Sequence, residues 1–255
     1  METKIKEIEK VLYRCGDLMR NADRDSISVN SKDGIGNFVT SYDKQVQDIL
    51  REELRKIIPE ATFVGEEEDV HASIERGIAF TVDPIDGTYN FMRDLKTSCI
   101  SVGITKDGAP LAGLIYNPYA DEMFTAVKNQ GACMNGKPIH VSDGALNGGL
   151  VLFGTAPYYS ELRKKTMRYV DDILDYAADV RRMGSAALDL CAVAAGRAEL
   201  YFELRLQPWD YMAGIVIVTE AGGRVTAMDK ETIRLGKPSS VLATNGKADY
   251  DFGME

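Results

Sequence analysis

The spacing of hydrophobic residues changes twice along this chain of 255 residues, and that change constrains the fold more than any other feature. Over residues 4–19, apolar side chains recur every three or four positions, which predicts an amphipathic helix. The same spacing over residues 46–58 predicts a second helix, with Ser41 or Asp43 as its N-cap and Pro59 at its end. The chain should therefore begin with two helices.

The middle of the chain has a β-strand character instead. Residues 77–142 form short β-like runs that are broken by an Asp-Gly and an Asn-Gly pair, and this pattern predicts an antiparallel meander of hairpins. After residue 145, strand and helix patterns alternate, which predicts a second sheet of mixed or parallel character with helices on its faces. We expect an α+β protein with subdomains 1–145 and 146–255 that share one interface, because no long linker separates them.

Composition narrows the classes of function. The chain holds 39 acidic and 30 basic residues, and this net acidity disfavours binding to nucleic acid. It has no run of eighteen apolar residues and no secretory signal, so we expect no membrane contact and a cytoplasmic location. The four cysteines are scattered singly and should be reduced. With two histidines, the chain has little material for histidine-based catalysis.

Carboxylates gather at three places where predicted elements begin or end. They are Glu66 to Asp69 after a short β-like run, Asp83 and Asp86 in "VDPIDGTYNF", and Asp210 in "PWD". Taken alone, Asp210 could act only as a helix N-cap, and the Glu66 segment could be a solvated turn.

The Asp83 and Asp86 pair has no such simple explanation. Pro84 cannot continue a central strand, and Gly87 gives the backbone freedom for a sharp turn, so the strand ends in two carboxylates. These repel each other unless a cation lies between them. Mg²⁺ binds through such carboxylates together with phosphate oxygens, and the amides of Gly87 and Thr88 could hold the phosphate itself.

The sequence departs from three other known motifs of enzymes and nucleotide-binding proteins. Phosphatases that form an aspartyl-phosphate place their aspartates two apart in DxDGT, whereas here the spacing is three, so a regular strand would not present both on one face. The segment Gly184-Ser185-Ala186-Ala187 lacks the second glycine of the serine hydrolase motif. Gly34-Ile35-Gly36 lacks the preceding strand and the third glycine of a dinucleotide-binding loop.

Four motifs in order, "GEE", "DPIDGTYNF", "GSAALDLCAVAAGRAELYFE" and "PWDYMAG", resemble those of the inositol monophosphatase family of lithium-sensitive, Mg²⁺-dependent phosphatases. The resemblance extends from about residue 40 to about residue 225. It implies a layered αβαβα sandwich, with an antiparallel N-terminal sheet, a mixed C-terminal sheet, and helices between and outside them. It also implies a homodimer.

The resemblance assigns roles to individual residues. The implied metal ligands are Glu66, Asp83, the carbonyl of Ile85, Asp86 and Asp210. Glu66 and Thr88 would orient and activate the attacking water, and Asp43 would support the threonine hydroxyl. The implied substrate contacts are Lys32, Asp86, Gly87, Thr88, Ser185, Ala186, Glu203 and Asp210.

The implied activity is hydrolysis of myo-inositol monophosphate with two to three Mg²⁺ ions, with Li⁺ as inhibitor and without a phosphoenzyme. Other branches of this superfamily hydrolyse fructose 1,6-bisphosphate, adenosine 3′,5′-bisphosphate, histidinol phosphate or NADP, and these substrates stay open. Tyr89, where many members have threonine, is a departure. A non-catalytic binding module is disfavoured, because the acidic ligands and the threonine are all present.

Overall fold

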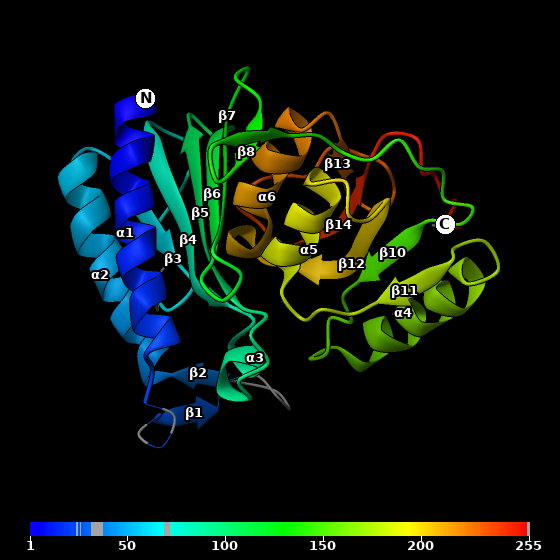
Figure 1. Ribbon diagram of the computed structural model, residues 1–255, viewed down its shortest axis with the longest axis horizontal. Coiled ribbons are helices and arrows are strands. Elements are labelled where there is room, and N and C mark those ends of the chain that lie inside the picture. Colours follow the sequence, from blue (N-terminus) through cyan, green and yellow to red (C-terminus); the bar gives the residue numbers. More distant parts are fainter. Residues whose placement is uncertain (24, 26, 32–37, 69–71, 254–255) are drawn as a thin grey trace.

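The computed structural model describes residues 1–23, 25, 27–31, 38–68 and 72–253. Its elements form five layers (Figure 1). Helices α1 (Glu2–Arg20) and α2 (Ser41–Ile57) cover a seven-stranded sheet, α5 (Ala186–Ala194) and α6 (Pro208–Glu220) lie between this sheet and a five-stranded one, and α4 (Ser160–Ile173) covers the far side. The predicted αβαβα sandwich is confirmed.

The two predicted N-terminal helices are both present, but the N-cap of α2 is neither Ser41 nor Asp43. Thr40 caps the helix, because its hydroxyl accepts hydrogen bonds from the amides of Tyr42 and Asp43. Asp43 occupies the third helical position and its side chain accepts the Thr40 amide, which completes a capping box. The predicted cap was wrong because Ser, Thr and Asp are all common N-cap residues and Asp also occurs at the third helical position, so the residue type does not fix the position.

The first sheet has the strand order β3-β4-β5-β6-β7-β8-β9. These strands are Thr62–Gly65, Ile78–Asp86, Cys99–Lys106, Ala109–Asn117, Glu122–Val127, Ala132–Met134 and Lys137–Ile139. From β4 onwards all neighbours are antiparallel, as the hairpin signals predict. Strand β3 instead pairs in parallel with β4 at the edge of the sheet. A separate two-stranded ribbon, β1 (Val29–Ser31) and β2 (Phe38–Thr40), leads into α2.

The second sheet has the order β11-β10-β12-β14-β13 and is mixed, as predicted. Its strands in chain order are Leu150–Phe153 (β10), Asp179–Arg181 (β11), Leu200–Leu206 (β12), Arg224–Thr226 (β13) and Ser239–Thr244 (β14). None of the helices in the described ranges combines the length and apolar character needed to cross a membrane.

Helices α5 and α6 are apolar on nearly every side because they pack between the two sheets. Helix α6 packs closely on β6, since a Cβ added at Gly113 would lie 2.3 Å from the carbonyl oxygen of Ala213. One continuous core therefore contains residues of both sheets, and the division near residue 145 stays a prediction. This arrangement brings the first turns of α5 and α6 to the end of β4.

Candidate active site

The end of β4 explains the spacing of its two aspartates. The pairing of β4 with β5 shifts register between Asp83 and Asp86, so a local irregularity lets both carboxylates reach the same cavity despite their spacing of three. Gly87 then turns the chain with a φ of +87°, and a Cβ there would lie 3.1 Å from the carbonyl oxygens of Gly184 and Thr97. Helix α3 (Thr88–Met92) begins immediately after this turn.

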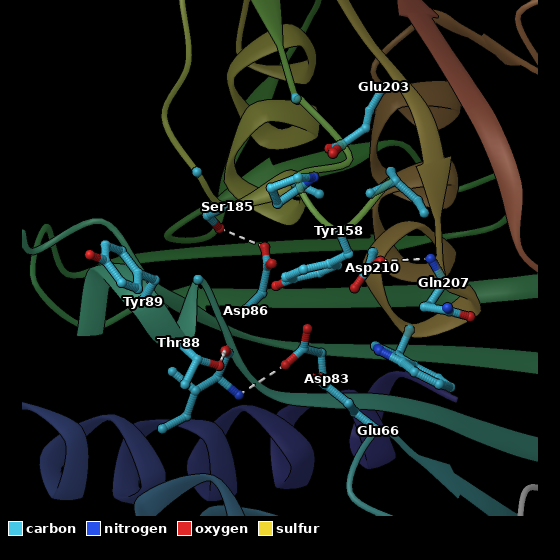
Figure 2. Close-up of a pocket in the computed structure, with 18 of the residues that line it drawn as sticks. Glu66, Asp83, Asp86, Thr88, Tyr89, Tyr158, Ser185, Glu203, Gln207 and Asp210 are labelled. Carbon is cyan, nitrogen blue, oxygen red and sulfur yellow. Dashed lines mark hydrogen bonds between the residues drawn. The ribbon is translucent and has the colours of Figure 1, made fainter. Parts of the chain in front are cut away.

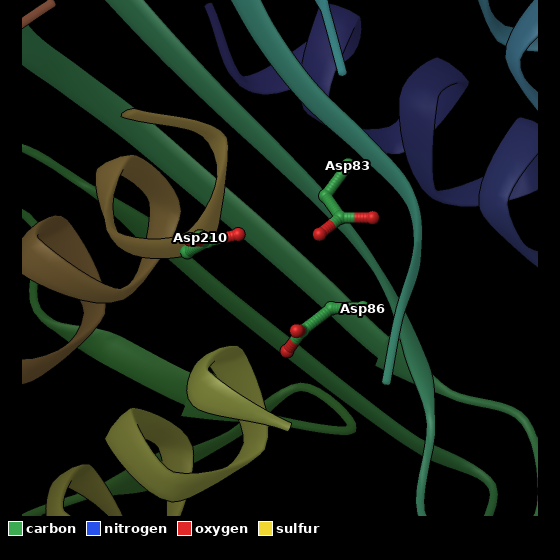
Figure 3. Close-up of side chains that lie close together, drawn as sticks. All are labelled: Asp83, Asp86 and Asp210. Carbon is green, nitrogen blue, oxygen red and sulfur yellow. The ribbon is translucent and has the colours of Figure 1, made fainter. Parts of the chain in front are cut away.

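Three carboxylates converge at this point, those of Asp83 and Asp86 buried and that of Asp210 partly buried. Asp83, Asp86 and Asp210 each offer an oxygen atom, and these atoms lie within 4.8 Å of one another (Figure 3). Burial and the neighbouring negative charges raise the pKa of Asp86 to about 6, and raise those of Asp83 and Asp210 well above the usual range. No salt bridge in the described ranges involves any of the three. A cluster of carboxylate oxygens without a cationic side chain could hold a metal ion.

Asp210 contributes to helix α6 as well as to this cluster. The N-cap of α6 is Gln207, and Asp210 occupies the third helical position. Its Oδ2 accepts a 2.6 Å hydrogen bond from the Gln207 amide, so the carboxylate is held in place at the start of the helix. Asp210 therefore stabilises the start of α6 and also belongs to the carboxylate cluster, although the N-cap residue is Gln207.

Helix α5 orients Asp86. Oδ2 of Asp86 accepts a 2.6 Å hydrogen bond from the Ser185 hydroxyl and a 2.7 Å hydrogen bond from the Ala187 amide. Ser185 is also the N-cap of α5. Ser185 and Ala186, both implied substrate contacts, line the cavity, but the Ser185 hydroxyl is already engaged with Asp86.

Thr88 and Asp43 form a second polar pair beside the carboxylates. The Thr88 hydroxyl oxygen lies 3.0 Å from Asp43 Oδ1 and 3.1 Å from the carbonyl oxygen of Ile85. Burial raises the pKa of Asp43 to about 6, and the charge of Glu66 adds to this effect. A hydroxyl has one proton, so donation to Asp43 leaves the Ile85 carbonyl available to another partner.

Glu66 enters the same cavity from strand β3. Its amide donates a 3.0 Å hydrogen bond to the carbonyl of Val82, which continues the pairing of β3 with β4. The parallel edge strand thus delivers Glu66 to the level of Asp83. Glu66 lines the cavity, and its negative charge raises the pKa of Asp83, Asp86 and Asp210, although it is not part of the tight group of three.

The cavity has a volume of about 1030 Å³ and lies between the two sheets (Figure 2). In addition to the carboxylates, it is lined by Gly87, Thr88, Ser185, Ala186 and Glu203, which are implied substrate contacts. Asp43 lies behind Thr88 and is buried. Lys32 lies outside the described residues. Tyr89, Tyr158 and Trp209 add aromatic surface to the walls.

Glu203 supports a loop that sequence reasoning missed. Its Oε1 accepts a 2.8 Å hydrogen bond from the Ala156 amide, and its Oε2 accepts a 2.9 Å hydrogen bond from the Tyr201 hydroxyl. Ala156 has a φ of +40°, which is unusual for a residue with a Cβ. The loop over residues 154–159 projects Tyr158 into the cavity (Figure 2). No local pattern in the sequence signals this contact.

Asn90 is a second residue that the sequence did not indicate. Its side-chain amide donates 2.8 Å hydrogen bonds to the carbonyls of Thr97 and Met183. It therefore joins α3 to the segment that precedes α5, and holds the turn at Gly87 against the second half of the molecule.

Comparison with known proteins agrees with this geometry. The model of the inositol monophosphatase family matches residues 2–252. An inositol-1-monophosphatase of Synechocystis sp. is 37% identical over 229 residues, covering 89% of this chain and 79% of that protein. The Nus factor SuhB of Escherichia coli K12 is 35% identical over 203 residues, covering 79% of this chain and 76% of that protein. A Thermotoga maritima IMPase structure superposes with a TM-score of 0.86 at 29% identity, covering 96% of this chain and 93% of that one.

Proposed function

Because the chain belongs to the inositol monophosphatase family, we propose that it is a Mg²⁺-dependent phosphomonoesterase that hydrolyses myo-inositol monophosphate to inositol and inorganic phosphate. The observation that carries this proposal is the convergence of Asp83, Asp86 and Asp210 at one end of a large cavity, beside Thr88. The family is one of phosphatases, and the choice of substrate and metal is the proposed part.

The charge of the site supports a need for metal. A phosphate ester is anionic, and the carboxylates of the cavity would repel it unless cations lay between them. When bound, Mg²⁺ would neutralise the negative charge of the phosphate group and lower the pKa of a water molecule that it binds. The proposed ligands are Glu66, Asp83, the Ile85 carbonyl, Asp86 and Asp210, and two to three ions would be held.

The remaining residues would position the reactants. Asp43 accepts a hydrogen bond from the Thr88 hydroxyl, so the lone pairs of Thr88 Oγ1 can accept a hydrogen bond from the attacking water and orient it. Glu66 would take the proton of that water as general base. The amides of Gly87 and Thr88 would bind the phosphate group.

The alcohol of the substrate would occupy the rest of the cavity. Ser185, Ala186 and Glu203 line this part. Lys32 would instead face the phosphate group. The cavity volume of about 1030 Å³ is at the upper end of the range for small-molecule sites, so it has room for a cyclic alcohol.

A phosphate-release panel tests the proposal. The substrates are myo-inositol 1-phosphate, fructose 1,6-bisphosphate, adenosine 3′,5′-bisphosphate, histidinol phosphate and NADP, each measured with Mg²⁺ and with EDTA. The highest kcat/KM should belong to the inositol ester, only with Mg²⁺, and Li⁺ should inhibit. A higher value for another ester would overturn the substrate, and release in EDTA would overturn the metal requirement.

We also propose a cytoplasmic homodimer that binds neither nucleic acid nor membranes. The family resemblance supports the dimer, and the net charge of −9 supports the lack of nucleic-acid binding. Sedimentation equilibrium at micromolar protein concentration should give twice the chain mass of 28.1 kDa. A single-chain mass would overturn the dimer.

A further inference from the structure

Asp189 is a buried carboxylate in the wall of the cavity, and the proposed chemistry gives it no role. It lies on α5, one helical turn after Ser185, and is 2% exposed. Its Oδ1 atom is fully buried and has no hydrogen-bond partner among the described residues. Native proteins rarely leave a buried polar atom unpaired, so such an atom calls for an explanation.

Asp189 differs in this respect from the other unpaired buried atoms. Those in the described ranges belong to Thr81, Ser98, Thr105, Tyr119 and Asp189, and of these residues Asp189 alone lines the cavity. The neighbouring carboxylates of the wall are already paired, since Asp86 accepts bonds from α5 and Glu203 accepts bonds from Ala156 and Tyr201. Because Oδ1 is closed off from the cavity, the atom of Asp189 that can meet a ligand is Oδ2, which accepts no hydrogen bond from the described residues.

The surroundings of Asp189 decide which ligand group it can bind. It is outside the tight cluster of Asp83, Asp86 and Asp210, so it is not grouped with the proposed metal ligands. An anionic phosphate would be repelled by Asp189 and by nearby Glu203. The cation near it, Arg182, is exposed and donates from Nε to the Thr155 hydroxyl at 3.2 Å. A neutral donor such as a hydroxyl group suits this acceptor best.

The charged neighbours of Asp189 in the cavity wall are mostly acidic. Glu203 and Asp86 are the negative groups that influence it most, after burial itself, and they raise its pKa well above the usual range, whereas Arg182 opposes them. Figure 2 shows Glu203 and Glu66 on opposite sides of Asp86. Ser185 lies on the same side of Asp86 as Glu203, and Asp189 follows Ser185 by one turn of α5. Asp189 is therefore on the side away from Glu66, where the alcohol of the substrate would lie.

We propose that Asp189 is a specificity-determining residue whose carboxylate accepts a hydrogen bond from a hydroxyl group of the leaving alcohol. This inference rests on the proposed phosphomonoesterase activity and adds to it a residue that would recognise a hydroxyl group of the alcohol. An ester without hydroxyl groups would leave the acceptor unpaired and would be a poorer substrate. Sites built to hydrogen-bond a substrate hydroxyl discriminate strongly against analogues that lack it.

The test compares two esters with the same ring, myo-inositol 1-phosphate and cyclohexyl phosphate, in the full-length protein with Mg²⁺. Asp189→Leu keeps the shape of the side chain but removes the acceptor. The ratio of kcat/KM for the inositol ester over the cyclohexyl ester should fall roughly 10- to 100-fold, because one hydrogen bond to a charged group is lost. Inhibition by inorganic phosphate should not change.

A stability measurement separates this role from a structural one. Asp189→Leu removes an unpaired buried carboxylate and should raise Tm, whereas a carboxylate that supports the fold would lower it when lost. Thr105→Val is the matched control, because it removes an unpaired buried hydroxyl on β5 outside the cavity lining. It should leave the substrate ratio unchanged.

Each remaining outcome has a defined meaning. Asp189→Asn, which keeps an amide oxygen as acceptor, should lower the ratio less than the leucine variant and serves if that variant does not fold. An equal loss on both esters would overturn the inference, because Asp189 would then act on the catalytic groups. An active wild type with an unchanged ratio in the variants would also overturn it. A wild type inactive on both esters would overturn the proposed function and this inference with it.

Discussion

The Ser185 hydroxyl donates a 2.6 Å hydrogen bond to Asp86, and this bond joins the end of β4 to the start of α5. The two residues are 99 positions apart, and the Ala187 amide reinforces the contact at 2.7 Å. The orientation of a proposed metal ligand therefore depends on the packing of the C-terminal half against the N-terminal sheet. Metal binding and the docking of the two halves should be coupled.

Ser185→Ala should weaken metal binding rather than abolish activity. Asp86 loses one of its donors but keeps the Ala187 amide, and loss of a residue that orients a metal ligand typically costs about 10- to 100-fold in affinity or activity. The midpoint of the Mg²⁺ activation curve should rise, with Ser160→Ala at the exposed start of α4 as the control. An unchanged midpoint would contradict the orienting role.

Asp86→Asn should reduce Mg²⁺-dependent phosphate release by at least about 100-fold, because a carboxylate of the proposed metal site becomes neutral. The fold should persist, since both bonds from α5 go to Oδ2 and an amide oxygen in its place can accept them. Circular dichroism checks the fold, and Asp171→Asn on the exposed face of α4 is the matched control. Retained turnover in the Asp86 variant would rule out the metal assignment.

Thr88→Val should lower kcat by about 10²- to 10⁴-fold while KM stays near the wild-type value. The substitution keeps the shape of the side chain but removes the hydroxyl that Asp43 holds at 3.0 Å. Thr88→Ser, which restores the hydroxyl, should recover most of the rate. If the valine and serine variants were equally slow, packing rather than water orientation would explain the effect.

The layered fold could be predicted because it depends on local spacing. A stripe of apolar residues is enough to predict each of the helices α1 and α2. The Asp-Gly and Asn-Gly pairs are likewise enough to predict their hairpins. The helix caps could not be predicted in this way, since aspartate is common both at the N-cap and at the third helical position, and Asp43 and Asp210 could have occupied either. Here they occupy the latter.

The candidate site could be predicted only as far as its carboxylates. Asp83 and Asp86 stood out because a proline separates them and a glycine follows. The expectation that Pro84 ends the strand was wrong, since β4 continues through it to Asp86. The register shift that aims both carboxylates at one cavity depends on the pairing with β5. The support of Ala156 by Glu203 and the unpaired oxygen of Asp189 depend on long-range packing. Such contacts leave no periodic mark in a single sequence.

Stability should depend on pH and metal together. Burial and neighbouring charges raise the pKa of Asp86 from 3.8 to about 6, so the metal-free folded state binds protons more tightly than the unfolded chain. This contribution to stability is present below about pH 4 and is lost as the pH rises through about 6. In EDTA, Tm should therefore fall over this range, to a smaller extent in Asp86→Asn.

Mg²⁺ should reverse that loss at higher pH. It competes with protons for the same carboxylates, so it should raise Tm at about pH 7.5 and have little effect at about pH 4.5. Calorimetry at both pH values, with EDTA and with saturating Mg²⁺, checks this. Equal stabilisation at both pH values would mean that the ions bind elsewhere.

Gly87→Ala should damage both stability and activity. The residue has a φ of +87°, where a Cβ costs about 1–2 kcal/mol. The new Cβ would also lie 3.1 Å from the carbonyl oxygens of Gly184 and Thr97, so the turn must move and carry Asp86 and Thr88 with it. Denaturant unfolding should show a loss of more than about 1 kcal/mol, and phosphate release should fall at least about tenfold.

Gly131→Ala is the matched control for that turn. Gly131 has a φ of +80°, but a Cβ there would have nothing within 4 Å, so the variant carries the backbone strain without the contact. It should lose about 1–2 kcal/mol of stability and keep full activity. If Gly87→Ala lost no more activity than Gly131→Ala, the turn after β4 would tolerate displacement. The close fit of Gly87 between Gly184 and Thr97 would then not be what aligns the carboxylates with Thr88.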